Sequence, residues 1–278
     1  MDAAIFMQVV AGLFGLIIGS FLNVVIWRLP ENEGIVTSRS RCRACAKTLA
    51  WYELIPVISF AIQQGRCRSC RAALSLQYPL VELACALLFV AVWRHLFIGS
   101  AGTELTASPQ LIIPLLYLFF AVCALIVIFV TDLRHFLIPD AIVYPAIVIS
   151  ALFTVLNKAV DCQWLMVNCS LVDVALSLGG SAFFLALVLV SRGAWMGLGD
   201  VKLAAFMGLF LGPAKLLTAL LLAFFAGSII GLALIGLRRK TLKSEVPFGA
   251  FLVPAALTVF FGGDAIMNVF STFMLLKP

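Results

Sequence analysis

The chain has 278 residues, of which 63% are hydrophobic and 12% are charged, and its mean hydropathy is +1.14. Ordinary soluble domains contain about 45–50% apolar residues, so this composition excludes a water-soluble globular protein. Disordered, collagen-like and disulfide-rich secreted chains are excluded as well, because the apolar residues extend over the whole length and Gly and Pro follow no period. The sequence therefore predicts a polytopic membrane protein.

Apolar runs of about the 20 residues that a transmembrane helix needs recur along the chain. The first run, 3–27, lacks the basic start and the cleavage site of a signal peptide and is expected to be a retained helix. The sixth run is short and Gly262-Gly263 interrupts the last, so seven and eight spans both fit. We expect an all-α membrane protein with about eight spans, at 3–27, 79–98, 110–131, 141–157, 171–191, 200–212, 214–237 and 249–276.

The distribution of positive charge predicts how these helices are oriented. Fifteen of the 19 Lys and Arg residues lie in alternate connections, at 28–78, 132–140, 192–202 and 238–248. Short loops rich in Lys and Arg stay in the cytoplasm, so these four are expected to be cytoplasmic and both termini non-cytoplasmic. The same asymmetry explains the net charge of +6, and no nucleic-acid partner is expected.

The longest polar segment, 28–78, contains two C-x-x-C pairs, Cys42 with Cys45 and Cys67 with Cys70. Two such pairs separated by 21 residues are typical of a zinc site with four thiolate ligands. Two disulfides or four unliganded thiols are the alternatives, although disulfides are disfavoured on a cytoplasmic face. A zinc ion with four cysteine ligands has no open position for a substrate, so its role would be structural.

Two aspartates lie where predicted spans meet cytoplasmic loops. Asp132 closes the third span, and Asp200 opens the sixth within the sequence Gly-Leu-Gly-Asp. Carboxylates at a bilayer edge are costly and usually functional. Both are predicted to lie at the same membrane boundary, so they can meet although 68 positions separate them. Each also has a structural explanation, Asp200 as a helix N-cap and Asp132 as the partner of Arg134.

A pair of aspartates at one site favours the hydrolysis of a peptide bond. Two adjacent carboxyl groups cannot both ionise cheaply, so one keeps its proton. The charged group then takes a proton from water while the neutral group polarises the scissile carbonyl. The glycines before Asp200 would let an extended peptide approach the backbone closely. A transporter or proton channel, with Glu82 and Asp173 extending a relay, is the alternative from another functional class.

Several motifs, taken in this order, resemble those of the bacterial type IV prepilin peptidases, and the resemblance covers nearly the whole chain. They are Gly19-Ser20-Phe21-Leu22-Asn23 with Arg28-Leu29-Pro30, the two cysteine pairs, Tyr78-Pro79-Leu80-Val81-Glu82, Asp132 to Asp140, Gly197 to Lys202, and Pro247-Phe248-Gly249. The resemblance implies a multi-pass enzyme of the bacterial inner membrane with two activities. It would cleave the leader of prepilins or type II secretion pseudopilins after a glycine at the cytoplasmic face. It would then methylate the new N-terminus with S-adenosylmethionine.

The resemblance also implies a role for individual positions. The aspartyl protease pair of the family corresponds to Asp132 and Asp200. The metal-binding cysteines of the family correspond to Cys42, Cys45, Cys67 and Cys70. The domains implied are a first transmembrane helix, a cytoplasmic zinc-binding domain associated with methyl transfer, and a transmembrane aspartyl protease domain, at 1–27, 28–78 and 79–278.

Binding of the methyl donor is associated in this family with the cytoplasmic loop. The resemblance implies that Gly65 and Glu53 contribute to a site for S-adenosylmethionine. The chain departs from the family at Arg66 and Ala250, where relatives often have lysine and proline. No glycine-rich nucleotide-binding fingerprint follows a predicted strand, so methyl transfer depends on the resemblance alone. A relative that only cleaves, with the loop as a scaffold, is the second interpretation. Membrane lipid is an expected partner, and the sequence does not indicate the oligomeric state.

Overall fold

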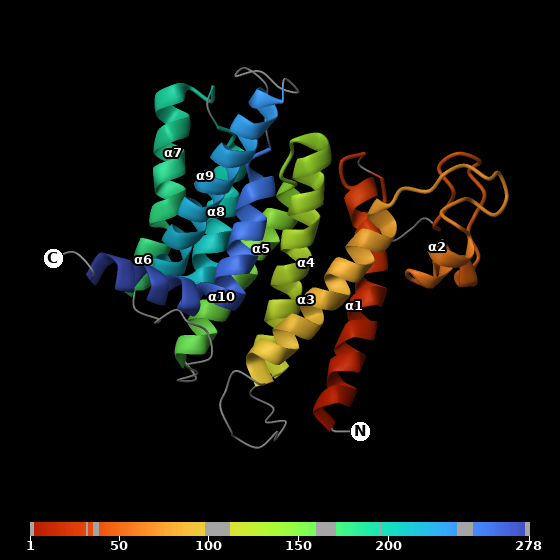
Figure 1. Cartoon of the computed structure of the whole chain (residues 1–278), viewed down its shortest axis with the longest axis horizontal. Helices are drawn as coiled ribbons and strands as arrows, with labels where there is room; N and C mark the ends of the chain where they lie inside the picture. Colours follow the sequence, from red (N-terminus) through yellow and green to blue (C-terminus); the bar gives the residue numbers. More distant parts are fainter. Residues whose placement is uncertain are drawn as a thin grey trace. The chain divides into compact units, whose positions relative to one another are not determined.

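The computed structural model describes residues 3–31, 33–35, 39–97, 112–159, 171–194, 196–237 and 247–275. Within these residues every regular element is a helix, which confirms the predicted all-α fold class (Figure 1). The elements are α1 (Ala3–Arg28), η1 (Trp51–Leu54), α2 (Ile58–Ile62), α3 (Gln77–Phe97), α4 (Ile112–His135), α5 (Asp140–Ala159), α6 (Leu171–Ser177), α7 (Gly179–Ser191), α8 (Leu198–Leu211), α9 (Pro213–Gly236) and α10 (Gly249–Leu275).

Five helical segments of the described residues are long and apolar enough to cross a membrane. They are Ala4–Arg28, Gln77–Phe97, Ile112–His135, Val172–Ser191 and Pro213–Gly236. The apolar parts of α5 and α10 are shorter. At 1.5 Å per residue, the 14 residues of α8 extend only about 21 Å, less than the roughly 30 Å of a bilayer core. The run predicted at 200–212 is helical but does not by itself cross a membrane.

The chain divides into two compact units, unit 1 at Met1–Val127 and unit 2 at Ile128–Pro278. The boundary falls within α4, which contributes its first part to unit 1 and its last two turns to unit 2. Each unit therefore has helical packing of its own.

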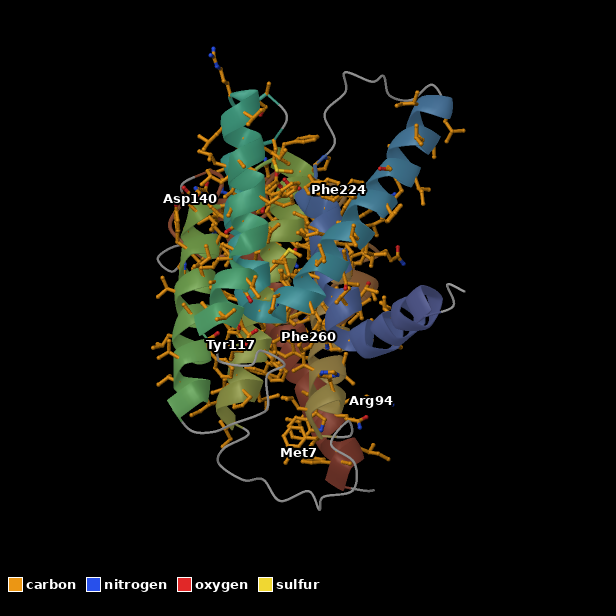
Figure 2. All side chains as sticks on the ribbon, turned by 90° about the vertical axis from the view of Figure 1, so that its left-hand side faces the viewer. Met7, Arg94, Tyr117, Asp140, Phe224 and Phe260 are labelled. Carbon is orange, nitrogen blue, oxygen red and sulfur yellow. The ribbon has the colours of Figure 1, made fainter. Side chains whose placement is uncertain are left out.

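Unit 1 is built around α1 and α3, which run antiparallel. Met7 near the start of α1 and Arg94 near the end of α3 lie at the same end of the pair (Figure 2). Gly15 and Gly19 of α1 permit a close approach, because a Cβ at either position would come within 2.7 Å of an α3 Cα atom. Small residues four positions apart are typical of membrane helices that pack backbone to backbone.

The other face of α1 carries apolar side chains at helical spacing. Val9, Leu13, Ile17 and Phe21 are each at least 50% exposed. A continuous exposed apolar stripe promotes aggregation in water, whereas in a bilayer it contacts lipid tails. The surface of α1 is therefore that of a lipid-facing helix.

In unit 2 the short helix α8 occupies the centre. From Leu203 to Leu211 every residue except Ala205 is buried, and α5, α7, α9 and α10 surround the helix (Figure 1). A helix that is apolar on all sides is typical of a position inside a bundle. Its first turn carries Asp200, so the buried part of α8 fixes the position of that carboxylate.

One helical run of unit 2 is interrupted and another bends, in both cases near glycines. The predicted run at 171–191 is divided into α6, which ends at Ser177, and α7, which begins at Gly179. A Cβ at Gly208 would overlap the Ser177 carbonyl oxygen, so glycine lets the end of α6 contact α8. The second change is in α10, whose ribbon bends close to Phe260 (Figures 1 and 2). Glycines are a common cause of such kinks, which agrees with the predicted interruption just after that residue.

Candidate active site and metal centre

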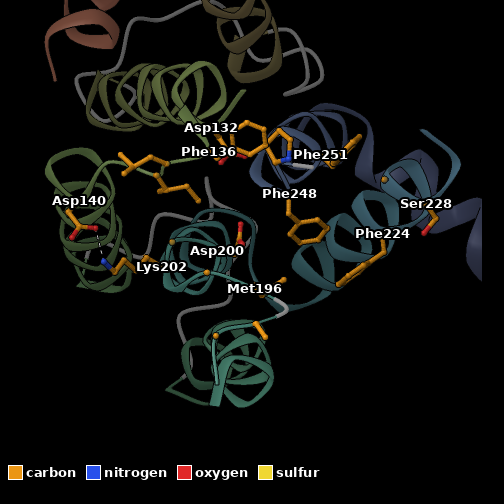
Figure 3. Close-up of a pocket in the computed structure, with 18 residues that line it drawn as sticks. Asp132, Phe136, Asp140, Met196, Asp200, Lys202, Phe224, Ser228, Phe248 and Phe251 are labelled. Atoms are coloured by element: carbon orange, nitrogen blue, oxygen red, sulfur yellow. Dashed lines mark hydrogen bonds and ion pairs between the residues drawn. The ribbon is translucent and has the colours of Figure 1, made fainter. Parts of the chain in front are cut away.

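Three connections between helices of unit 2 meet at one cavity of about 750 Å³ (Figure 3). They are the end of α4 with the α4–α5 connection, the α7–α8 connection with the first turn of α8, and residues 247–251 at the start of α10. One side of α9 completes the wall. All three connections belong to the segments that the charge pattern predicts on one side of the membrane.

Asp132 lies in the last turn of α4 and is only 5% exposed. Its Oδ2 accepts a hydrogen bond of 3.0 Å from the Ala250 N–H, and the Gly249 N–H also donates to the carboxylate. A Cβ at Gly249 would lie 2.8 Å from Oδ2, so the glycine leaves room for the carboxylate. The sequence did not reveal the role of the motif Pro247-Phe248-Gly249. In the structure, backbone N–H groups at the end of this motif orient the Asp132 carboxylate.

Asp200 is the third residue of α8, and its side chain points toward Asp132 (Figure 3). The N-cap of α8 is Gly197, so the interpretation of Asp200 as the N-cap is wrong. The Asp200 carboxylate instead accepts a hydrogen bond from the Gly197 N–H and interacts electrostatically with Asp132. At Gly199 a Cβ would come within 3.1 Å of the Ile138 side chain, so this glycine lets α8 approach the α4–α5 connection.

The walls on the two sides of the aspartates differ in polarity. On one side Lys202 donates a hydrogen bond of 2.6 Å to Asp140, at the start of α5 (Figure 3). On the other side the rings of Phe224 and Phe248 are 4.9 Å apart, and Phe251 lines the same wall. A substrate in the cavity would therefore meet a charged surface on one side of the aspartates and an aromatic surface on the other. These phenylalanines could not be singled out from the sequence, because 23 phenylalanines are spread along an apolar chain.

The arrangement of the two carboxyl groups suits general acid–base chemistry. Two like charges at close range favour a state in which one group is protonated. The backbone N–H groups at residues 249 and 250 fix the orientation of Asp132, and Gly197 fixes that of Asp200. Carboxyl groups held in this way by backbone donors are positioned before a substrate arrives.

The four predicted metal-binding cysteines come together in unit 1. Their Sγ atoms all lie within 4.8 Å of one another, and those of Cys42 and Cys70 are 3.9 Å apart. A tetrahedral site with Zn–S bonds of about 2.3 Å requires sulfur atoms about 3.8 Å apart. A disulfide requires about 2.05 Å, and all four thiols are free. The cluster therefore has the composition and spacing of a tetrahedral metal site.

The two cysteine pairs lie in two copies of the same turn. In each copy the first cysteine N–H bonds to the carbonyl five residues later, and its carbonyl accepts from the residue four positions later. The residue after the second cysteine has positive φ in both, Ala46 at 57° and Arg71 at 59°. The copies are 25 positions apart and share the sequence Arg-Cys-Arg-x-Cys-x-x-x-Leu, at 41–49 and 66–74. The repeat can be recognised in the sequence from the arginines and the leucine that the two copies share, and not from the positions of the cysteines alone.

Comparisons with known proteins connect both sites to one family. The model of the bacterial peptidase A24 N-terminal domain matches residues 13–96, and that of the type IV leader peptidase family matches residues 118–232. A prepilin leader peptidase/N-methyltransferase of Legionella pneumophila is 31% identical to this chain. The match covers 95% of this chain and 94% of the relative. The chain belongs to the type IV leader peptidase family. This membership confirms the resemblance seen in the motifs.

Two further relatives of the same name agree with this membership. That of Bacillus subtilis is 30% identical over 93% of this chain and 95% of its own length. That of Aeromonas hydrophila is 33% identical over 94% of this chain and 92% of its own length. No solved structure matches the chain. The transporter interpretation finds no support in these comparisons.

The two thiols of the second cysteine pair differ in pKa: that of Cys67 is lowered, whereas burial and hydrogen bonds to the neighbouring thiols raise that of Cys70 to about 11. The N–H groups of Cys70 and Ser69 donate to Cys67 and lower the pKa of its thiol to about 6. Metals bind the thiolate, so a lower pKa favours binding at neutral pH. Cys42 and Cys67 are buried, whereas Cys45 and Cys70 are exposed.

Contacts at the end of α1 hold the first copy of the turn. Arg28 is 7% exposed and donates to three backbone carbonyls between residues 34 and 39. Arg43, inside the first cysteine pair, stacks 3.8 Å from the Trp27 ring centroid and pairs with Glu31. A guanidinium on an aromatic face adds a favourable cation–π interaction. The peptidase thus ties its cysteine cluster to a membrane helix.

The two residues implied for cofactor binding each have a local structural role. The Glu53 Oε2 accepts a hydrogen bond of 2.9 Å from the Ala50 N–H and so caps the N-terminus of the short helix η1. Gly65 has φ of 66°, and a Cβ there would lie 3.0 Å from the Phe60 ring. Only glycine adopts this conformation readily. Both residues lie in the segment between the cysteine pairs.

Proposed function

We propose that this protein is a prepilin leader peptidase and N-methyltransferase, with Asp132 and Asp200 as its catalytic pair. Family membership and the names of the relatives support both activities. The observation that carries the assignment of residues is that two carboxyl groups from α4 and α8 interact within one cavity. An aspartyl protease needs such a pair.

In the proposed cleavage, one carboxylate accepts a proton from a water molecule, whose oxygen adds to the scissile carbonyl carbon. The neutral partner donates a hydrogen bond to the carbonyl oxygen. The C–N bond then breaks and the leaving nitrogen takes up a proton, which produces a new N-terminal amine. The charged side of the cavity, with Lys202 and Asp140, suits the polar part of a substrate, and the aromatic side suits the apolar part.

We assign the metal as zinc and its role as structural. Four thiolates in tetrahedral spacing favour zinc, and a site with four protein ligands leaves no position for a substrate. The four cysteines hold together the ends of the segment between them, from Ala46 to Arg66. In this proposal, methyl transfer takes place in a cytoplasmic domain at 28–78, next to the first helix at 1–27 and the protease domain at 79–278.

S-adenosylmethionine supplies the methyl group for the second activity. In the proposed reaction, the neutral amine released by cleavage would attack this methyl group, the methyl–sulfur bond would break, the thioether S-adenosylhomocysteine would leave, and the methylated amine would give up a proton. Gly65 and Glu53 are the residues we assign to the methyl-donor site. The carboxylate of Glu53 suits a positively charged donor or amine, and the assignment of Gly65 rests on the resemblance to the family.

The proposed location is the bacterial inner membrane, with the catalytic face in the cytoplasm. The apolar helices support a multi-pass membrane protein, and the basic connections support a cytoplasmic cavity. A basic leader would be held near the anionic inner leaflet, so that the cleavage site lies at the membrane boundary. The substrates would be prepilins or type II secretion pseudopilins.

The direct test is cleavage of a purified prepilin in detergent, with products identified by mass. Wild type is expected to release the leader after a glycine, and Asp200→Asn is expected to leave the substrate intact. With S-adenosylmethionine present, the wild-type product should gain the mass of one methyl group. Cleavage by Asp200→Asn at the wild-type rate would overturn the catalytic assignment. Cleavage without methylation would favour a cleavage-only enzyme.

A further inference from the structure

A buried carboxylate of unit 1 belongs to neither of the two sites. Glu82 lies in the second turn of α3 and is 6% exposed. Its Oε2 accepts a hydrogen bond of 2.7 Å from the Val57 N–H. The Ser20 hydroxyl of α1 also donates to the carboxylate. A carboxylate buried in a membrane protein is costly, so its retention calls for a specific role.

The partner of Glu82 has a strained backbone. Val57 has φ of 59° and ψ of −49°, and the Ile58 N–H bonds back to the Pro56 carbonyl. These features define the rare, strained form of the three-residue γ-turn. A β-branched residue at positive φ is an outlier, because its side chain crowds the backbone. Such a conformation persists only where the surrounding structure holds it.

The strained turn sets the course of the chain between the cysteine pairs. It separates η1, which contains Glu53, from α2, which leads to Gly65. Val57 is also the N-cap of α2, so its backbone angles set the direction in which that helix begins. The hydrogen bond that Glu82 accepts from Val57 therefore ties the segment with both proposed cofactor residues to α3.

We propose that Glu82 is a positioning residue for methyl transfer, which holds Val57 in its strained turn and so fixes the segment from Glu53 to Gly65. The proposal rests on the assignment of methyl transfer to residues 28–78. The residues assigned to peptide cleavage, Asp132 and Asp200, lie in unit 2. Loss of the Glu82 contact is therefore expected to separate the two activities.

The first variant is Glu82→Ala, which removes the acceptor. Methyl transfer to a peptide that has already been cleaved is expected to fall at least about tenfold, because small misplacements of reacting groups are costly. Cleavage should stay within about threefold of wild type, and the bound metal should not change. The matched control is Glu33→Ala, which removes an exposed carboxylate paired with Arg41 and should leave both activities unchanged.

A second substitution tests the strain directly. Glycine reaches positive φ without a steric cost, so Val57→Gly alone should leave methyl transfer near the wild-type rate. Added to Glu82→Ala, it should restore a large part of the lost activity, because the turn no longer needs to be held. A general loss of folding at Glu82 would not be repaired by a more flexible residue at position 57.

Glu82→Gln keeps an oxygen that can accept the Val57 N–H, and it should methylate at close to the wild-type rate. The proposal is overturned if Glu82→Gln is as impaired as Glu82→Ala, if Val57→Gly fails to rescue, or if both activities fall together. Exchange of the Val57 amide hydrogen, expected to accelerate in Glu82→Ala, does not depend on enzymatic activity. If the wild type cleaves but does not methylate, the proposed function fails, and this exchange still decides whether the Glu82 contact exists.

Discussion

The cysteine cluster of unit 1 and the aspartate cavity of unit 2 differ in the length of chain that builds them. The four cysteines and the bonds that shape their turns lie within residues 40–74. The aspartate cavity joins Asp132, Asp200 and Ala250, and the bond from Ala250 to Asp132 spans 118 positions. The cysteine cluster is thus a product of local turns, whereas the aspartate pair exists only after the helices of unit 2 have packed.

This difference predicts that damage to either site stays within its own unit. Local turns shape the cysteine cluster, so it should survive changes in the cavity. The cavity depends on buried helix contacts, so it should respond to small changes in packing. The variants below test this separation, from the largest expected effect to the smallest.

Asp132→Asn and Asp200→Asn are each expected to reduce cleavage by about a thousandfold or more, because general acid–base catalysis is lost. Asparagine keeps an oxygen that can accept the backbone N–H groups around each position, so the fold should be retained. Bound metal and methyl transfer to a peptide that has already been cleaved should be unchanged. Cleavage assays by mass, with metal analysis of the same samples, check both expectations. Loss of the metal in either variant would contradict the separation of the sites.

Cys45→Ser and Cys70→Ser test the separation from the other side, by damaging the cysteine cluster of unit 1 and leaving the aspartate cavity of unit 2 intact. Each removes one of the four candidate ligands. Stoichiometric binding of the metal is expected to be abolished, since the described residues offer no replacement thiolate within the cluster. Methyl transfer should fall by about a hundredfold, while cleavage changes by only a few-fold. Metal content and the two activities, measured on one preparation, provide the check. Equal losses of cleavage and methyl transfer would show that the cluster supports the whole enzyme.

Gly249→Ala places a methyl group 2.8 Å from the Asp132 Oδ2 and forces the carboxylate to move. Cleavage is expected to fall by about 10- to 100-fold, since displacements near 1 Å are costly in catalysis. Gly231→Ala in α9 is the matched control, because nothing lies within 4 Å of its new methyl group. Rates of cleavage at equal protein concentration check the prediction. An equal effect of the two substitutions would show that the space beside Asp132 is unimportant.

Gly19→Ala tests the packing of α1 on α3 in unit 1. The new Cβ would lie 2.7 Å from the Glu82 Cα, so the two helices must separate. The expected loss of stability is about 1–3 kcal/mol, typical of overpacking. Gly12→Ala is the comparison, because its Cβ meets only the end of the Val90 side chain at 3.3 Å. Thermal unfolding in detergent should show a larger decrease in Tm for Gly19→Ala than for Gly12→Ala.

Asp140→Asn removes the negative partner of Lys202 at the edge of the cavity. The Asp140 side chain is 61% exposed, and exposed ion pairs contribute at most about 1 kcal/mol. The Tm is therefore expected to change by only a few degrees. Thermal unfolding measures this, and a large decrease in Tm would show that the pair supports the bundle.

The sequence alone determined the class of the protein, the candidate residues and the family. Apolar composition predicts membrane helices because a bilayer requires long apolar helices with their backbone groups satisfied. The two C-x-x-C pairs predict a metal site because each pair forms a turn that needs no distant partner. Asp132 and Asp200 could be selected because a carboxylate at a membrane edge is costly wherever it occurs.

Only the tertiary structure decided how these residues are held. The backbone N–H groups at 249 and 250 look like any others in the sequence, and their contact with Asp132 depends on how α4 and α10 pack. The buried position of the short helix α8 and the hydrogen bond from the Val57 N–H to Glu82 likewise depend on neighbours distant in the chain. Periodicity and local spacing report on residues within a few turns of one another. Contacts made by the packing of separate helices leave no such pattern.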